Sequence, residues 1–178
     1  MSAHQRQSST VACRCGAVVL QASGPPIAHA ACYCASCQEA GRRMEQLPGA
    51  APVLDADGGT DYVLYRKDRV RVVQGAERMQ SLRLKPDSPT RRLVATCCNS
   101  ALFLDFTKGH WLTLYRARVA GPVQPLEMRV MTSAKPDGVV LPSDVPNYPT
   151  HSGKLMGRLL AAWIRMGFRI PKVDGAPV

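Results

Sequence analysis

The chain has 178 residues, of which 46% are apolar, and it carries a formal net charge of +10. A chain of this length can bury a core as one domain, and its apolar content excludes a largely disordered protein. No apolar run approaches the roughly 20 residues of a membrane-spanning helix, and the first residues lack the apolar stretch of a secretory signal. We therefore expect a cytoplasmic protein with a flexible tail over residues 1–10 and a single domain over residues 11–178.

Cysteines form the first clear pattern along the chain. All seven fall into three clusters: Cys13 and Cys15, then Cys32, Cys34 and Cys37, then Cys97 and Cys98. Gly16 directly follows the first cluster and permits a tight turn that brings two sulfurs around one ion. The last two cysteines of the second cluster have the Cys-x-x-Cys spacing that zinc sites commonly use.

Four interpretations of these clusters differ in what they explain. Disulfides fit poorly, because an odd number of cysteines cannot all pair and a cytoplasmic compartment keeps thiols reduced. A redox pair at Cys34 and Cys37 would need a strand–helix–strand context that the pattern lacks. Buried cysteines that act as small hydrophobes explain one or two positions but not the clustering. Zinc takes four tetrahedral ligands and binds thiolates well, so metal binding explains all three clusters.

Short β-strands dominate the expected secondary structure in the middle of the chain. Six segments are rich in β-branched and aromatic residues: 61–66, 70–73, 79–84, 92–95, 101–106 and 111–116. Turn-forming residues separate them, which predicts a mainly β protein with antiparallel sheets and not a doubly wound α/β fold. Ahead of these segments, Ser36 and Glu39 have the spacing of a capping box, which predicts a short helix that ends at Gly41.

The last third of the chain combines an irregular connection with one helix. Residues 135–151 hold four prolines, which disfavour regular structure. Residues 152–167 follow a helical period, and Gly167 is suited to end the helix. The apolar face of this helix would consist of Leu155, Leu159, Ala162, Trp163 and Met166. A basic amphipathic helix can lie on a membrane, but the simpler expectation is that its apolar face docks onto the sheet.

Two stretches, CRCGAVVLQASGPP and ACYCASCQEAG, resemble the start of the glutathione-dependent formaldehyde-activating enzyme family, which includes the centromere-protein-V-like proteins. That family opens with Cys-x-Cys-Gly and continues into Cys-His-Cys-x-x-Cys. The resemblance covers residues 13–41 and is weaker over 97–103. It implies a β-tent, in which folded antiparallel sheets surround zinc. Tyr33 stands where the family has His, and adjacent cysteines at 97 and 98 replace a Cys-x-x-Cys-Gly motif.

The resemblance implies two zinc sites of different kinds. Cys13 and Cys15 would join the late cluster in a closed structural Zn²⁺ site, in which Cys98 is the expected ligand and Cys97 either takes part or lies apart. The second cluster would hold another Zn²⁺ through Cys32, Cys34 and Cys37 as the catalytic residues. The fourth position there would stay open, as it does in catalytic zinc sites.

The implied activity is that of a carbon–sulfur lyase of the S-(hydroxymethyl)glutathione synthase type. Such an enzyme joins formaldehyde, or a similar carbonyl compound, to a thiol such as glutathione. Zinc would favour the thiolate form of the incoming thiol, which is its nucleophilic form. Arginines near the site could hold the carboxylates of glutathione or of another small anionic molecule.

A second interpretation stays open, in which the chain is a non-catalytic binding module stapled by zinc. Its basic surface would then meet nucleic acid or an acidic partner, since a net charge of +10 favours anionic ligands. The three Phe, two Trp and five Tyr offer few side chains on which bases could stack. His29, between the first two cysteine clusters, is expected to be exposed in a loop, with a role as a stray metal ligand as the alternative.

Overall fold

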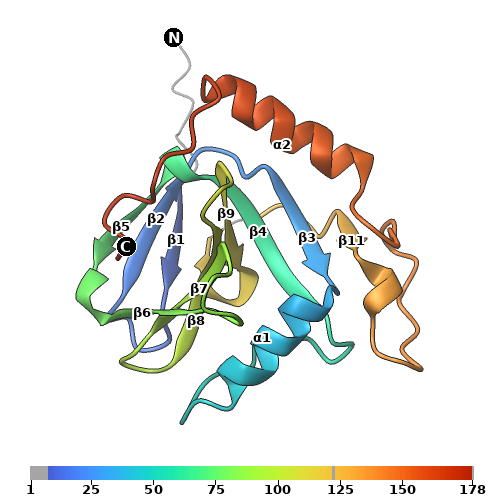
Figure 1. The fold of residues 1–178 in the computed structure, drawn as a ribbon, viewed down its shortest axis with the longest axis horizontal. Helices are drawn as coiled ribbons and strands as arrows, with labels where there is room; N and C mark the ends of the chain where they lie inside the picture. Colours follow the sequence, from blue (N-terminus) through green and yellow to red (C-terminus); the bar gives the residue numbers. More distant parts are fainter. Residues whose placement is uncertain (1–7, 122, 178) are drawn as a thin grey trace.

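This computed structural model describes residues 8–121 and 123–177. They contain two β-sheets and two α-helices (Figure 1). The four-stranded sheet has the order β10-β1-β2-β5 and consists of β1 (Ser8–Ala12), β2 (Val19–Ser23), β5 (Val70–Gln74) and β10 (Val119–Ala120). The seven-stranded sheet has the order β11-β3-β4-β9-β8-β7-β6. It consists of β3 (Ala28–Cys32), β4 (Thr60–Arg66), β6 (Met79–Leu82), β7 (Thr90–Ala95), β8 (Ser100–Phe106), β9 (Trp111–Tyr115) and β11 (Met128–Val130). Only the β11–β3 pair is parallel among these ladders.

The mainly β fold with antiparallel sheets confirms the expectation from the sequence. All six predicted segments are strands, β4 to β9. Five further strands were not predicted, because β1, β2 and β3 are rich in small or polar residues and β10 and β11 are very short. The expectation of a flexible tail is wrong for residues 8–10, because they belong to β1, which pairs with β2 and β10. Residues 1–7 of that tail lie outside the described residues.

The seven-stranded sheet is covered on both faces, and β4 shows how the sequence achieves this. Alternate side chains of a strand point to opposite faces. Val63 and Tyr65 belong to the core between the two sheets, whereas Tyr62 and Leu64 belong to a second core on the helical side. Strands that are buried on both faces read as nearly continuous apolar runs, which is why the pattern of β4 is not a strict alternation.

Helix α1 (Ala35–Glu45) follows β3 directly and differs from the prediction at both ends. Its N-cap is Cys34, and no side chain caps it, so the expected capping by Ser36 is wrong. Glu39 instead pairs with two arginines one turn further along the helix. The helix also continues through Gly41. A Cβ atom at Gly41 would lie 2.5 Å from the Leu54 side chain, so close packing accounts for this glycine.

Helix α2 (Gly153–Arg165) docks onto the helical side of the seven-stranded sheet, as expected. The Ser152 hydroxyl caps it by accepting a hydrogen bond from the Leu155 amide at 3.0 Å. Most of the predicted apolar face is buried, namely Leu155, Leu159, Ala162 and Met166. Figure 1 shows α2 lying across one end of β3 and β4, while α1 lies at the opposite end. Residues 135–151 form the expected irregular connection.

Neither helix in the described part of the chain combines the length and apolar content that a membrane crossing requires.

Candidate metal centres

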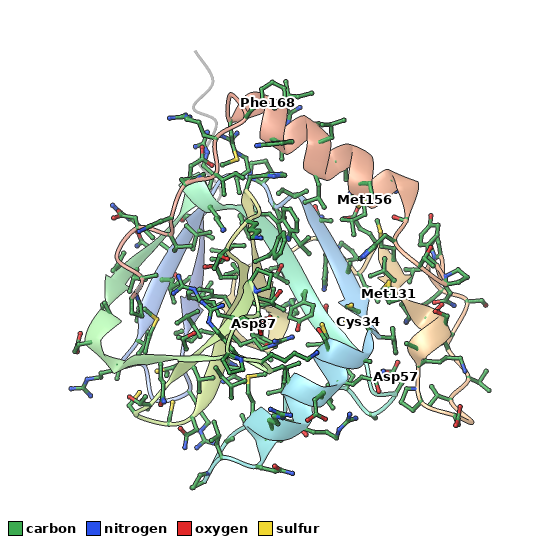
Figure 2. All side chains as sticks on the ribbon, in the orientation of Figure 1. Cys34, Asp57, Asp87, Met131, Met156 and Phe168 are labelled. Carbon is green, nitrogen blue, oxygen red and sulfur yellow. The ribbon has the colours of Figure 1, made fainter. Side chains whose placement is uncertain are left out.

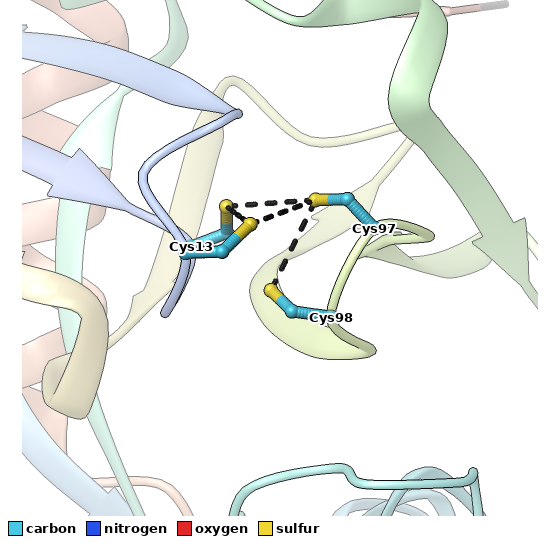
Figure 3. A group of neighbouring side chains, drawn as sticks. Cys13, Cys97 and Cys98 are labelled. Atoms are coloured by element: carbon cyan, nitrogen blue, oxygen red, sulfur yellow. Dashed lines mark hydrogen bonds between the residues drawn. The ribbon is translucent and has the colours of Figure 1, made fainter.

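The first and third cysteine clusters meet at one point, although they are far apart in the sequence (Figure 3). The ligand atoms of Cys13, Cys15, Cys97 and Cys98 all lie within 4.8 Å of one another. Four of the sulfur–sulfur distances are 3.3 Å (15 to 97), 3.6 Å (13 to 15), 3.8 Å (13 to 97) and 4.0 Å (97 to 98). The structure therefore brings the sulfur of Cys97, which the sequence left open, together with the other three.

These distances suit a tetrahedral metal ion and exclude disulfides. A disulfide bond needs about 2.05 Å between its sulfurs, and all four cysteines are free. Four thiolates at about 2.3 Å from a zinc ion would be separated by about 3.8 Å along each edge of the tetrahedron. The four distances given above, 3.3 to 4.0 Å, bracket this value, and all six lie within 4.8 Å. We call this group the four-cysteine site; its donors fit Zn²⁺.

Two turns hold the sulfurs of the four-cysteine site. Gly16 has a positive φ of 76° and donates its amide to the Cys13 carbonyl, which closes the turn after β1. The adjacent Cys97 and Cys98 lie in the turn between β7 and β8, where Asn99 has a φ of 49°. Neighbouring side chains of a regular strand point to opposite faces. Because these two cysteines lie in a turn, both sulfurs reach the same point.

Hydrogen bonds prepare the four-cysteine site for negative charge. The Val18 amide donates to the sulfur of Cys13 at 3.2 Å, and the Ser100 hydroxyl lies 3.1 Å from the sulfur of Cys98. Burial raises the pKa of Cys98, but hydrogen bonds from Ser100 and Cys15 outweigh burial and lower this pKa to about 6. A thiolate is the form that binds metal, so this environment favours metal binding.

The second cysteine cluster lies at the junction of β3 and α1. Cys32 ends β3, Cys34 is the N-cap of α1, and Cys37 lies in the first turn of the helix. Their three sulfurs lie within 4.8 Å of one another, and no fourth His, Cys, Asp or Glu among the described residues joins them. Hydrogen bonds from the other two sulfurs lower the pKa of Cys34, and the contact with Cys34 raises the pKa of Cys32. We call this group the three-cysteine site; it provides three of the four donors that zinc requires.

Two sources of positive charge lie near the three-cysteine site. The N-terminal end of α1 carries the positive end of the helix dipole. Arg92, which is 1% exposed, donates from Nη2 to the carbonyl and hydroxyl oxygens of Ser36 at 3.1 and 3.2 Å. The Ser36 hydroxyl in turn lies 3.8 Å from the sulfur of Cys34. Arg92 has no carboxylate partner among the described residues, and its Nε has no hydrogen-bond partner there. A buried cation is costly without a countercharge, and Ser36 connects this one to the sulfur of Cys34.

Tyr62 connects the three-cysteine site to the core. Its hydroxyl donates to the sulfur of Cys37 at 3.6 Å, and its ring packs against that of Tyr115, with 5.1 Å between the centroids. Burial raises the pKa of Tyr62 well above its ordinary value, so the phenol stays a hydrogen-bond donor. Sequence reasoning missed Tyr62 and Arg92. The signal for Arg92 is a charged residue that directly precedes the apolar residues Leu93, Val94 and Ala95 of β7.

A cavity of about 260 Å³ opens beside the three-cysteine site, between the seven-stranded sheet and α2. Cys32 and Cys37 form part of its wall, whereas Cys34 does not. Figure 2 shows Cys34 where β3 leads into α1, with Met131 close by and Met156 further along on α2. Met156 is also part of the cavity wall. The three-cysteine site is therefore accessible from a chamber that α2 covers.

Two residues that stand near the cysteines in the sequence do not join either site. Tyr33 points away, where its hydroxyl donates to a carboxylate oxygen of Asp57 at 2.6 Å. His29 is 5% exposed within β3, so its expected exposure in a loop is wrong, and it belongs to neither cysteine group. Its ring nitrogens lie 2.6 Å from the Gln124 carbonyl and 2.6 Å from a carboxylate oxygen of Asp61.

Comparisons with known proteins give a family match and similar solved structures. Residues 6–115 match the family described as "Family of unknown function (DUF6151)". No curated protein matches the chain. A crystal structure of a Rhodobacter sphaeroides protein is similar at 17% identity, over 78% of this chain and 98% of that one, with a TM-score of 0.45.

Proposed function

The chain belongs to the DUF6151 family, whose function is unknown, and we propose that it binds two zinc ions with different roles. The four-cysteine site would be structural, because four thiols complete a tetrahedron. The three-cysteine site would bind a thiol and a carbonyl compound and join them through a carbon–sulfur bond. The observation that carries this proposal is the convergence of three sulfurs, two of which, those of Cys32 and Cys37, belong to the wall of a cavity.

The proposed reaction is an addition with no net oxidation or reduction. A zinc ion at the three-cysteine site would favour the thiolate form of a substrate thiol at its open fourth position. The substrate sulfur attacks the carbonyl carbon, a carbon–sulfur bond forms, and the carbonyl π electrons move to oxygen. That oxygen takes up a proton equivalent to the one that the thiol released. With formaldehyde, the product is an S-hydroxymethyl hemithioacetal, and the reverse reaction is a carbon–sulfur cleavage.

Protein groups around the three-cysteine site support this chemistry. Tyr62 lines the same cavity, and its hydroxyl would exchange its hydrogen bond to Cys37 for one to the oxygen that gains charge. Three thiolates and one zinc ion carry a net charge of −1, which the buried Arg92 would balance. The resemblance of residues 13–41 to the formaldehyde-activating enzymes also supports the proposal. Seven free cysteines suit a reducing compartment such as the cytoplasm.

Metal content and turnover in the Cys34→Ser variant test the proposal. We expect wild type to hold two zinc ions, and the variant to hold one and to form the S-hydroxymethyl adduct at the uncatalysed rate. Thiols add to formaldehyde unaided. The rate of exchange between the free thiol and its S-hydroxymethyl adduct, measured by NMR, must therefore be compared with a protein-free control. Cys15→Ser is the matched control, since it removes an exposed cysteine from the four-cysteine site. Full turnover in Cys34→Ser, or wild type without zinc, would contradict the proposal.

The binding-module interpretation also has an observation in its favour. Four arginines, Arg66, Arg69, Arg158 and Arg165, line a cavity of about 530 Å³ between the β2–β3 turn and α2. Arg66 and Arg158 pair with carboxylates, whereas Arg69 and Arg165 form no ion pair among the described residues. In this second proposal, the cavity binds an anionic group of a partner such as nucleic acid.

Salt dependence separates the two proposals. Binding of a single-stranded oligonucleotide should weaken steeply as salt rises, since each neutralised phosphate releases counterions. The Arg69→Gln, Arg165→Gln double variant should then reduce both the affinity and the salt slope. If the oligonucleotide does not bind at low salt, the binding-module proposal fails for nucleic acid.

A further inference from the structure

Building on the proposed function, we propose that the thiol used at the three-cysteine site has an apolar, uncharged body and is not glutathione. Its sulfur would approach Cys32 and Cys37, and its body would fill the cavity between the seven-stranded sheet and α2. The walls of that cavity, its size and its opening each point to this class of substrate.

The walls of the cavity are almost entirely apolar. Aliphatic and aromatic side chains from β4, β8, β9 and α2 enclose it, among them Leu64, Leu104, Trp111 and Leu159. Its polar side chains are two cysteines, Tyr62, Thr113 and His151, and it contains no Asp, Glu, Lys or Arg. Such a wall stabilises a ligand by removing apolar surface from water.

Glutathione has two carboxylates and one ammonium group, which need charged or strongly polar partners when they leave water. The cavity wall supplies none for the carboxylates apart from His151 at its exposed edge. The four arginines that could hold carboxylates line a different cavity, which shares no lining residue with this one. A charged thiol would therefore have to bury its charges without partners in order to bring its sulfur to the site.

The size of the cavity limits the body of the ligand. A dry apolar cavity of about 150 Å³ is large enough to hold benzene. The present cavity, at about 260 Å³, has room for a ring with a short substituent or for a short alkyl chain. Typical pockets for drug-sized ligands begin at about 300 Å³, so the expected ligand is small.

The opening of the cavity lies on the α2 side. Among its lining residues, only His151 and Met156 are exposed, and Met156 is 51% exposed at the start of α2. Figure 2 shows Met156 at the start of α2 and Cys34 where β3 leads into α1; Cys32 and Cys37, which flank Cys34 in the chain, form part of the cavity wall. A thiol that enters past Met156 would therefore have its sulfur directed toward the cysteines while its body contacts the sheet.

Cobalt-loaded protein allows binding to be measured independently of turnover, because the visible absorption of Co²⁺ changes when its fourth ligand changes. The probes are phenylmethanethiol, its para-carboxylate and glutathione, each added at the same pH. We expect phenylmethanethiol to saturate the spectral change. The para-carboxylate should bind at least about tenfold more weakly, since its added charge is buried without a partner. Glutathione should produce no change at the same concentration.

Two variants test whether the ligand binds in the cavity, and a third variant is their control. Ala30→Leu adds bulk to a buried wall residue and should weaken phenylmethanethiol binding by about tenfold, since overfilling a packed site is costly. Met156→Trp narrows the opening from an exposed position and does not depend on repacking the core. Ile164→Trp is matched to it, because Ile164 is 54% exposed on the same helix and outside the cavity wall. Ile164→Trp should bind as wild type does.

The outcomes separate this inference from the proposed function. Glutathione binding as tightly as phenylmethanethiol, or unchanged binding in both cavity variants, would overturn the inference. Cobalt that occupies only the four-cysteine site would instead overturn the proposed function, and with it the premise. If phenylmethanethiol binds as expected but no adduct with formaldehyde forms, the apolar ligand class is supported and the reaction is not.

Discussion

Replacing Cys97 by serine separates the effect of a metal cross-link from that of side-chain packing. Cys97 is exposed, whereas Cys13 is buried in the core between the sheets. Substitution of an exposed residue usually changes the free energy of unfolding by about 0.5 kcal/mol or less. A large loss in Cys97→Ser would therefore have to come from a lost metal ligand.

The expected loss can be worked out from the contact that the four-cysteine site makes. Cys13 and Cys97 are 84 positions apart in the chain. A cross-link that closes a loop of that length lowers the entropy of the unfolded chain. At room temperature this stabilises the folded state by about 4.5 kcal/mol. With a urea dependence of about 2 kcal/mol/M, losing this cross-link should lower the urea midpoint by about 2 M. The three-cysteine site closes only a short loop, so Cys34→Ser should cost about 2 kcal/mol.

The assay is urea unfolding of wild type and Cys97→Ser, each with zinc and after removal of zinc by a chelator. With zinc, the variant should unfold at the lower urea concentration and contain one zinc ion fewer. After chelation, the two proteins should agree to about 0.5 kcal/mol. If Cys97→Ser keeps the zinc content and the urea midpoint of wild type, then the four sulfurs do not form a metal cross-link and the reasoning is refuted.

Three further predictions concern groups outside the cysteines. Tyr62→Phe should slow adduct formation by about tenfold with unchanged zinc content, since one buried hydrogen bond is lost; an unchanged NMR exchange rate would exclude Tyr62 from the reaction. The His29 ring donates from both nitrogens only when protonated, and although burial lowers its pKa, hydrogen bonds, chiefly to Asp61, raise it more. His29→Gln should therefore lose most stability below about pH 6.5, and the difference from wild type should shrink as pH rises through the raised pKa of His29; a difference independent of pH in urea unfolding would contradict this. Asp105→Ala should cost about 3–5 kcal/mol in urea unfolding, because the buried ammonium of Lys67, 2.8 Å away, loses its partner; a loss of under about 1 kcal/mol would contradict it.

The sequence predicted most of the strands because local patterns determine them. Segments such as 101–106 and 111–116 carry β-branched and aromatic residues between clear turns, and both became strands of nearly the same length. Strand β3 reads Ala-His-Ala-Ala-Cys and has no such pattern. It is a strand because β4 and β11 pair with it on both sides, and this pairing depends on tertiary structure.

The cysteine groups were predictable in part for the same reason. The three-cysteine site lies within one short stretch of chain, so its spacing alone brings the thiols together. The participation of Cys97 could not be read from the sequence, because it depends on the left-handed conformation of Asn99 in the turn after β7. Arg92 and Tyr62 also escaped prediction, since only the sheet register places them beneath α1.

The position of the cavity wall along the chain has a consequence for how ligand choice could change. All seven cysteines lie within residues 6–115, the part that matches the family, whereas Val130, His151 and Leu155 of the cavity wall come after it. Under the proposed function, the metal ligands come from the family-matching part alone, whereas part of the surface that would select the ligand comes from the C-terminal third. Relatives that keep the cysteines but differ in the C-terminal third would share one chemistry while accepting different ligands.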